Sequence, residues 1–231
     1  MYFDSPVNLS LLSILIVLVG SANKFGILFI GIRLFKPAEV VAVVGVGVNE
    51  FTFAIIGGGA AGFFSALSVK QHFPMHEVII LEKTTKVLAK VKVSGGGRCN
   101  VTNNQLDSIV LSKHYPRGEN YLKKAFDIFN VQDTFNWFEE RGVALKVYPD
   151  GCVFPLANDS QVIIDCFTRE ADRLHIKIEY QAAVQEIQIE KDHFILKTRD
   201  QSYSFDKVII TTGGQPKRNG LEWLEKLGHT I

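Results

Sequence analysis

Three glycines, Gly57, Gly59 and Gly62, follow a short apolar run and have the types and spacing to hold a diphosphate. Gly57 allows a tight turn, Gly59 lets the backbone approach a pyrophosphate without a Cβ in the way, and Gly62 lets the following helix pack closely. Ala60 and Ala61 complete the motif. A pyrophosphate on this turn would lie at the positive end of that helix.

A second apolar run, 78–81, ends in Glu82, which lies 20 residues after Gly62. At the tip of a strand its carboxylate can accept hydrogen bonds from the ribose hydroxyls of an adenosine, whereas a 2′-phosphate there would be repelled. Strand, glycine turn, helix, second strand and terminal acid together predict a dinucleotide-binding unit. The alternative is a glycine-rich turn without a ligand, such as the unaccompanied glycines at 44–47.

A second candidate loop has three successive glycines, which can expose backbone N–H groups to an anion. It consists of Ser94, Gly95, Gly96, Gly97, Arg98, Cys99 and Asn100. Arg98 adds a planar donor fork suited to phosphate or to a flavin edge, and the alternative is a flexible surface loop. Lys90 and Lys92 alternate on the approach, so an extended segment would turn one lysine to a cofactor and the other to solvent. Cys99 has no partner thiol nearby, and we expect no redox role for it.

These motifs require alternating strands and helices from residue 51 onward. The helix after Gly62 should stop before Pro74, and His72 and His76 beside that stop are expected to form a solvated helix end. One or two helices with an aromatic face are predicted over 120–141, and another over 161–174 behind the capping residues 158–160. Cys166 in that helix should be buried.

In the later part of the chain, the spacing of the apolar residues changes from a helical to an alternating pattern. Residues 176–180 predict a third parallel strand, and short alternating runs at 184–189, 193–198 and 202–205 predict a β-meander. The apolar run 208–210, followed by Thr211 to Gly214, predicts a buried strand that returns to the parallel sheet. The fold class is therefore α/β: a Rossmann-like parallel sheet with helices on both faces and a β-meander.

Composition sets limits on partners. The 231 residues carry a net charge of +1 and are 47% hydrophobic, which allows a sizeable core and gives no electrostatic reason to expect nucleic acid as a partner. Three widely spaced cysteines, Cys99, Cys152 and Cys166, argue against zinc and against a disulfide framework. We expect a reducing, cytoplasmic setting.

Residues 1–50 form an apolar leader that is separate from the domain expected over 51–231. The runs 9–20 and 26–35 are each shorter than the ~20 residues that span a bilayer. Joined, they would place Lys24 near the membrane centre, which is unfavourable. Membrane contact is expected only through residues 9–35, with a membrane-anchored protein as the alternative to a dispensable leader. Residues 40–48 could add a strand.

From about Ala54 to Ile231 the chain resembles the bacterial FAD-dependent flavoproteins known as aminoacetone-oxidase-like NAD(P)/FAD-dependent oxidoreductases. The distinguishing string is Ser-Gly-Gly-Gly-Arg-Cys-Asn-x-Thr-Asn at 94–103, supported by the first glycine motif, by 81–83 and by the turn 212–214. One departure is Thr211, where the family usually has alanine.

The resemblance implies a glutathione-reductase-like FAD domain with FAD in an extended form. The ADP part would lie on Gly57 to Gly62 and Glu82, and the pyrophosphate or isoalloxazine near Ser94 to Asn100. Adenine would be held partly by backbone at Val184. The full set of cofactor-binding residues expected beyond the two glycine loops is Glu82, Lys83, Lys90, Val184, Thr212, Gly213 and Gly214.

The resemblance also implies an oxidoreductase that moves a hydride or an electron pair between a small organic substrate and flavin, with NAD(P)H or oxygen as a redox partner. Family members continue into a substrate-covering domain and a C-terminal segment that closes over the flavin. We therefore expect this chain to be a fragment that is incomplete at the C-terminus. The alternatives are an NAD-dependent dehydrogenase and a non-catalytic nucleotide-binding remnant.

Overall fold

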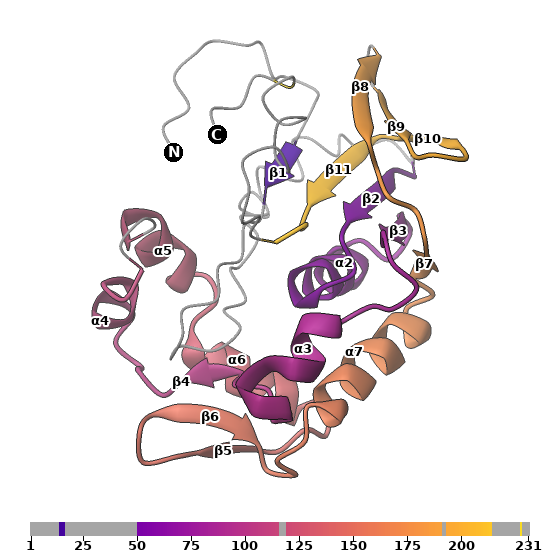
Figure 1. The fold of residues 1–231 in the computed structure, drawn as a ribbon. Coiled ribbons are helices and arrows are strands. Elements are labelled where there is room, and N and C mark those ends of the chain that lie inside the picture. Colours follow the sequence, from indigo (N-terminus) through magenta and orange to yellow (C-terminus); the bar gives the residue numbers. More distant parts are fainter. Residues whose placement is uncertain (1–13, 17–49, 116–118, 191–192, 214–226, 228–231) are drawn as a thin grey trace.

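The computed structural model describes residues 14–16, 50–115, 119–190, 193–213 and 227. Its centre is a parallel sheet in the order β1-β11-β2-β3-β7 (Figure 1). The strands are β1 (Ile14–Ile16), β2 (Thr52–Ile56), β3 (Glu77–Leu81), β7 (Lys177–Glu179) and β11 (Lys207–Ile210). The predicted third strand and the returning strand are both confirmed, and the returning strand lies directly beside β2.

The strand register brings three chain segments level with one another. Ile56 pairs with Leu81 on one side and with Ile210 on the other. Gly57, Glu82 and Thr211, the residues that come next on the three strands, therefore emerge in one row at the carboxyl edge of the sheet. This is the edge at which open α/β sheets bind ligands.

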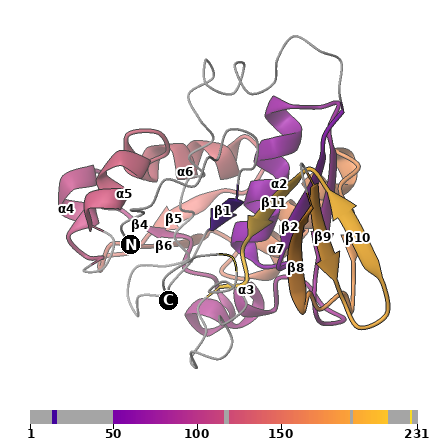
Figure 2. The ribbon, with the colours of Figure 1, turned by 90° about the horizontal axis from the view of Figure 1, so that it is seen from above.

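Both faces of the sheet are covered, as its continuous apolar strands require. On one face Ile55, Ile80 and Ile209 pack with α2 (Ala60–His72) and α7 (Gln161–Arg173). On the other, Ala54 and Ile210 belong to a cluster with the meander strands β8 (Glu186–Glu190), β9 (His193–Lys197) and β10 (Ser202–Phe205). The expected α/β class with its β-meander is confirmed, and among the described residues the meander takes this second face (Figure 2).

A second lobe lies between β3 and α7 in the sequence. It contains α3 (Ala89–Val93), the 3₁₀ turn η1 (Ser94–Gly97), β4 (Thr102–Asn103), α4 (Ser108–Ser112), α5 (Glu119–Phe126), α6 (Val131–Glu139), β5 (Leu145–Val147) and β6 (Cys152–Pro155). The segment 120–141 forms two helices because Asn130 caps α6 through a reciprocal pair of hydrogen bonds with Asp133. Its aromatic side chains divide between two clusters. Phe126 packs with α4, and Phe138 joins the main core.

Helix α7 is confirmed, and one of the expected capping residues, Asp159, caps its start. The Asp159 carboxylate accepts the Gln161 N–H at 2.8 Å, so Asp159 supplies the side-chain cap. The neighbouring Ser160 hydroxyl donates to the Lys92 carbonyl instead, at 2.9 Å. The start of α7 is thereby tied to α3.

Two local expectations were wrong. The approach to the second glycine loop is the helix α3 and not an extended strand, so Lys90 and Lys92 do not alternate across a sheet. The Lys-Val alternation misled because only Val91 is buried, whereas Val93 is 73% exposed. His76 is not solvated: it is 6% exposed and packs against the rings of Phe51, Phe53 and Phe73.

The described part of the chain contains no helix with the length and apolar character that crossing a bilayer requires. Apart from β1, the apolar leader and the possible strand over 40–48 lie outside the described residues.

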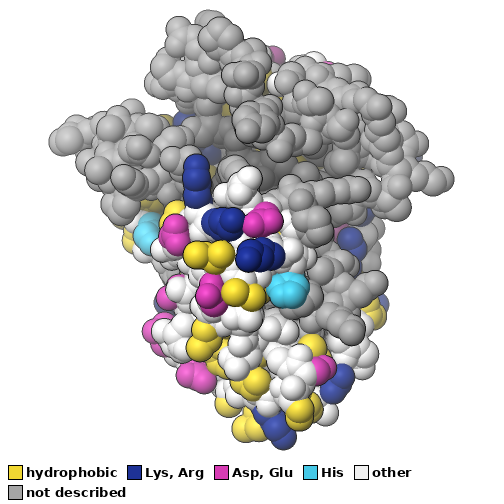
Figure 3. All heavy atoms as spheres, turned by 90° about the vertical axis from the view of Figure 1, so that its left-hand side faces the viewer, with side chains coloured by type: hydrophobic (Ala, Val, Ile, Leu, Met, Phe, Trp, Pro, Cys, Tyr) yellow, Lys and Arg dark blue, Asp and Glu magenta, His cyan; other side chains and the backbone are white. Residues whose placement is uncertain are grey.

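On the face drawn in Figure 3, described Lys and Arg side chains lie among Asp, Glu and apolar ones and do not form a single block.

Candidate dinucleotide site

The first glycine turn needs glycine at two positions for different steric reasons. Gly57 has φ +112°, and a Cβ on it would lie 2.7 Å from the Thr211 carbonyl oxygen. A Cβ on Gly62 would lie only 2.0 Å from the Gly57 carbonyl oxygen. The turn is therefore pressed against β11 on one side and against the first turn of α2 on the other.

Gly59 differs from both, because a Cβ on it would meet no atom of the described residues within 4 Å. It precedes α2 with φ −88°, an extended conformation open to any residue. Ala60, which is buried, and the half-buried Ala61 begin the helix. The space over Gly59, at the positive end of a 13-residue helix, is where a diphosphate would approach.

Glu82 is 9% exposed, and its carboxylate is already hydrogen-bonded within the protein. Oε2 accepts the Gly58 N–H at 2.8 Å, and Oε1 accepts the N–H and the hydroxyl of Thr84 at 2.9 Å each. A carboxylate has about four acceptor sites, so capacity for a ribose hydroxyl is left. The anchoring of the glycine turn by Glu82 is a role that sequence reasoning missed. The adjacent Lys83 is exposed.

The second glycine loop also has backbone that only glycine adopts readily. Gly95, Gly96 and Gly97 have φ of +55°, +69° and +87°. A Cβ on Gly96 would meet nothing within 4 Å, whereas a Cβ on Gly95 would lie 2.8 Å from Phe154 in β6. The loop thus has one side packed on the β5–β6 hairpin and one open side, at Gly96.

The side chains that follow the glycines hold the loop in place. Arg98 Nε donates to the Gly95 carbonyl at 3.2 Å, and its guanidinium lies 4.2 Å from the centre of the Phe154 ring. The Asn100 side-chain oxygen accepts the Val153 N–H at 3.2 Å. These contacts place Arg98 and Asn100 as supports of the loop, and any contact of Arg98 with a ligand would use its remaining N–H groups.

Cys99 is buried, and its backbone N–H donates to the Ser94 carbonyl at 3.0 Å. Burial raises the pKa of the Cys99 thiol to about 11, so the thiol stays protonated at neutral pH. The absence of a redox role for Cys99 stays a prediction. The Ser94 hydroxyl donates to the Val91 carbonyl at 2.8 Å, which closes the end of α3.

Helix α3 brings the glycine loops together. Just before it, the Leu88 N–H donates to the Gly58 carbonyl at 2.8 Å, and directly after it comes Ser94. Lys90 Nζ lies 3.6 Å from where a Cβ on Gly213 would stand, so this lysine reaches the turn after β11. Lys92 instead contacts Gln161, at 3.0 Å.

The turn after β11 contributes an unpaired hydroxyl. Thr212 Oγ1 is buried and has no hydrogen-bond partner among the described residues. Gly213 has φ +73°, and Gly214 lies outside the described residues. Nearby, the Ala182 N–H donates to the Glu82 carbonyl at 2.9 Å, so the segment that leads to the half-buried Val184 runs beside Glu82.

These features fit a dinucleotide better than a compact ligand. Among the described residues, nothing lies within 4 Å of a Cβ on Gly59 or on Gly96, and the buried Thr212 hydroxyl lacks a hydrogen-bond partner. The short helix α3 connects the two glycine loops. Among the described residues, no cluster of His, Cys, Asp or Glu is arranged to hold a metal ion.

The comparison with known families decides the class of this fold. Residues 51–231 match the model described as the HI0933-like protein Rossmann domain. The chain belongs to the HI0933-like family. A flavoprotein and oxidoreductase assignment agrees with this family and with the relatives below.

Two curated relatives of this HI0933-like chain are named as enzymes, one a reductase and the other a synthase. It is 25% identical over 183 residues to the 3-dehydro-bile acid delta(4,6)-reductase of Clostridium scindens, covering 77% of this chain and 44% of that protein. It is 25% identical over 166 residues to the ribosomal RNA dihydrouridine synthase of Escherichia coli, covering 72% of this chain and 40% of that protein. The chain thus spans about two-fifths of the length of these relatives.

The fold is also found among solved structures. The crystal structure of Thermovibrio ammonificans THI4 is similar with a TM-score of 0.51 at 11% identity, over 78% of this chain and 64% of that one. At this identity the likeness concerns the fold, and it supports the glutathione-reductase-like Rossmann class predicted from the sequence.

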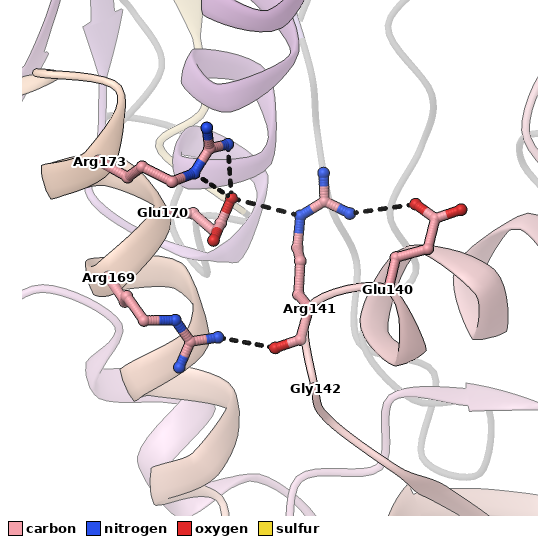
Figure 4. A pocket seen from close by; sticks show the side chains of 6 residues that line it. All are labelled: Glu140, Arg141, Gly142, Arg169, Glu170 and Arg173. Carbon is pink, nitrogen blue, oxygen red and sulfur yellow. Dashed lines mark hydrogen bonds and ion pairs between the residues drawn. The ribbon is translucent and has the colours of Figure 1, made fainter.

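A charged pocket elsewhere in the HI0933-like domain is not part of this site (Figure 4). It is lined by Glu140, Arg141, Gly142, Arg169, Glu170 and Arg173. It lies at the carboxyl end of α7, whereas Ser160 at the other end of α7 donates its N–H to the Gly97 carbonyl. A helix of 13 residues is about 20 Å long, so the pocket is remote from the glycine loops.

Proposed function

We propose that this domain binds FAD in an extended conformation as part of a flavin-dependent reductase. The observation that carries the proposal is that two glycine loops adjoin the two ends of α3, and that a Cβ on Gly59 or on Gly96 would meet no described atom within 4 Å. A mononucleotide needs one such loop. A dinucleotide with a long linker between its rings uses both.

Each end of the site has residues suited to one part of FAD. The turn Gly57 to Gly62 would hold the pyrophosphate on the N-terminus of α2, with Glu82 and the backbone at Val184 toward the adenosine. The loop Ser94 to Asn100 would take the flavin side. Lys90, which reaches the turn after β11, and the Thr212 hydroxyl, which belongs to that turn, would donate to FAD oxygens.

When bound, FAD would supply two-electron redox chemistry, and NAD(P)H is the proposed electron donor. One curated relative is named as a delta(4,6)-reductase of a 3-dehydro-bile acid and the other as a dihydrouridine synthase. Addition of hydrogen across a carbon–carbon double bond in a ring that also carries a carbonyl group would account for both names. We therefore propose an unsaturated carbonyl compound as the substrate class of the whole protein. The narrower likeness to aminoacetone-oxidase-like proteins belongs to this proposal as well.

The cofactor is tested first. The full chain is purified, incubated with FAD, freed of excess ligand, and examined by visible absorption and flavin fluorescence, with NAD in a parallel sample. We expect FAD to be retained and to raise the melting temperature, with no comparable effect of NAD. Stabilisation by NAD alone would favour the dehydrogenase alternative, and a response to neither would favour the nucleotide-binding remnant.

The substrate class, which is proposed for the whole protein, is tested on that whole protein loaded with FAD, after anaerobic photoreduction. We expect an α,β-unsaturated cyclic ketone to restore the oxidised flavin spectrum, and the corresponding saturated ketone to leave the spectrum unchanged. Equal behaviour of the two ketones would contradict the substrate class without affecting the cofactor assignment.

A further inference from the structure

We propose that Thr211 and Glu82 hold the peptide between Gly57 and Gly58 from both sides, and that Thr211 is thereby a positioning residue for the cofactor diphosphate. This inference rests on the proposed FAD site. It assigns a role to the side chain of Thr211, a position where the flavoprotein family that this chain resembles usually has alanine.

The carbonyl end of that peptide is held from β11. Thr211 is 5% exposed, and its hydroxyl lies 2.9 Å from the Gly57 carbonyl oxygen and 2.9 Å from the Ile56 carbonyl oxygen. Its backbone N–H also donates to Ile56, at 2.9 Å. The hydroxyl therefore continues the β11–β2 ladder one residue past the last strand pair, onto the glycine turn.

The amide end of the same peptide is held from β3. The Gly58 N–H donates to Glu82 Oε2 at 2.8 Å, in a buried hydrogen bond to a carboxylate. Hydrogen bonds with one charged partner are stronger than neutral ones. Because the C=O and N–H of a trans peptide point in opposite directions, the two side chains oppose any rotation of this peptide plane.

The next peptide is fixed in turn. The Gly58 carbonyl accepts the Leu88 N–H at 2.8 Å, so the Gly59 N–H on the other side of that planar peptide is directed away from Leu88. Three strand ends and the start of α3 thus set the orientation of the turn before any ligand arrives. Glycine-rich backbone is otherwise conformationally permissive, and ordering it on binding would reduce affinity.

The test compares variants of the full chain that differ at one hydroxyl. Thr211→Val keeps the shape of the side chain without the hydroxyl, Thr211→Ala removes it without adding an atom, and Thr211→Ser restores it. The dissociation constants of ADP and FAD are measured by calorimetry and by flavin fluorescence. We expect the valine and alanine variants to bind both ligands about two- to tenfold more weakly, the range of one hydrogen bond, and the serine variant to bind like the native chain.

A matched control separates positioning from general stability. Thr134 in α6 is 6% exposed, and its hydroxyl donates to the Asn130 carbonyl at 3.0 Å, far in the sequence from the glycine turn. Thr134→Val should lower the melting temperature to a similar degree and leave both dissociation constants unchanged. A Thr211 effect that Thr134→Val reproduces, or that serine does not rescue, would overturn the proposal.

The two proposals fail in different ways. If the native chain binds neither ADP nor FAD, the proposed cofactor site is wrong and the positioning role falls with it. If the native chain binds FAD and both hydroxyl-free variants bind it equally well, only the role of Thr211 is wrong.

Discussion

Gly59 and Gly62 belong to one motif but meet opposite steric demands. No atom in the described part of the chain lies within 4 Å of a Cβ on Gly59, whereas a Cβ on Gly62 would lie 2.0 Å from a backbone oxygen. The fold therefore tolerates a larger side chain at Gly59, where only a bound ligand would be affected. At Gly62 the fold itself excludes any side chain.

Gly59→Val should leave the protein folded and prevent FAD binding. Its extended backbone accepts valine, while the side chain would fill the space where the diphosphate approaches. We expect a melting temperature near that of the native chain without ligand and FAD affinity reduced by at least about tenfold, the loss of one charge-assisted hydrogen bond. Circular dichroism and fluorescence titration measure the two quantities.

Gly62→Ala is the matched comparison. It should lower the free energy of unfolding by roughly 2 kcal/mol or more, because the added methyl group forces α2 away from the turn. Equal stability of Gly62→Ala and the native chain would contradict the close packing described for this turn.

We expect His76 to make the stability of the domain depend on pH. Its Nδ1 lies 3.3 Å from the Phe51 N–H, and its buried Nε2 has no partner among the described residues. Burial, aided by Lys70, lowers the pKa of His76 below 6.5. The unfolded chain therefore takes up the proton first. Stability is full above about pH 6.5 and falls as the pH decreases to the folded-state pKa.

His76→Asn should remove this pH dependence, because the asparagine side-chain oxygen can accept the Phe51 N–H without titrating. Urea unfolding between pH 7.5 and 5 measures the effect. His72→Asn is the control, since His72 is exposed at the end of α2 and its loss should leave the pH profile intact. A native chain as stable at pH 5 as at pH 7.5 would disprove the role of His76.

At the scale of elements, the clearest features of the sequence predicted the structure well. The apolar runs of β2, β3 and β11 are long and continuous enough to predict buried parallel strands. The runs of alternating apolar and polar residues predicted the β-meander. Helix α3 was missed because its five residues alternate like a strand and begin after Leu88, whose φ of +56° no local pattern indicates. Its position depends on hydrogen bonds to Gly58 and Ser160, which are distant in sequence.

The sequence indicated which residues form the candidate site, but not the structural role of each of them. The glycine positions follow from spacing, since spacing reflects backbone geometry. The anchoring by Glu82 and Thr211 could not be read from the sequence, because both contacts depend on the strand register that aligns them with the turn. A buried acid at a strand tip signals a polar partner but does not say whether the partner is ligand or backbone.

Helices α6 and α7 are joined by a charge cluster whose members differ in burial. The Glu170 carboxylate lies 2.8 Å from Arg173 and 3.6 Å from Arg141, with 9% of its side chain exposed. Glu170→Gln should lower the free energy of unfolding by about 1–3 kcal/mol, because two guanidinium groups lose their counter-charge. FAD affinity should not change, since the cluster lies at the far end of α7.

Glu140→Gln is the matched variant for that prediction. Glu140 lies 3.6 Å from Arg141 but its side chain is 72% exposed, and an exposed ion pair contributes at most about 1 kcal/mol. Chemical denaturation of the two variants should rank Glu170→Gln well below Glu140→Gln. The reverse order would show that Glu170 does not join the helices.

At the scale of the whole molecule, charge argues against nucleic acid as a partner, while one relative's name contains ribosomal RNA. With a net charge of +1 and charges of both signs mixed on the surface in Figure 3, we expect no measurable binding of this chain to an rRNA fragment at 150 mM salt, roughly physiological ionic strength. Filter binding across a salt series measures this. Tight binding that weakens steeply with salt would contradict the expectation and favour an RNA substrate.

The shortness of α3 has a consequence for ligand recognition. Leu88 is hydrogen-bonded to the Gly58 carbonyl of the first glycine turn, and only five residues separate it from the second glycine loop. The two glycine loops, each a candidate half of the site, therefore stand at a fixed spacing. Two weakly held groups joined by a tether of matching length bind as one bivalent ligand, since occupancy of the first half raises the effective concentration of the second. AMP and riboflavin offered as separate molecules would each gain little from such a receptor. In the proposed FAD site, the covalent bridge between them would supply the avidity, and the length of α3 would set the length of bridge that fits.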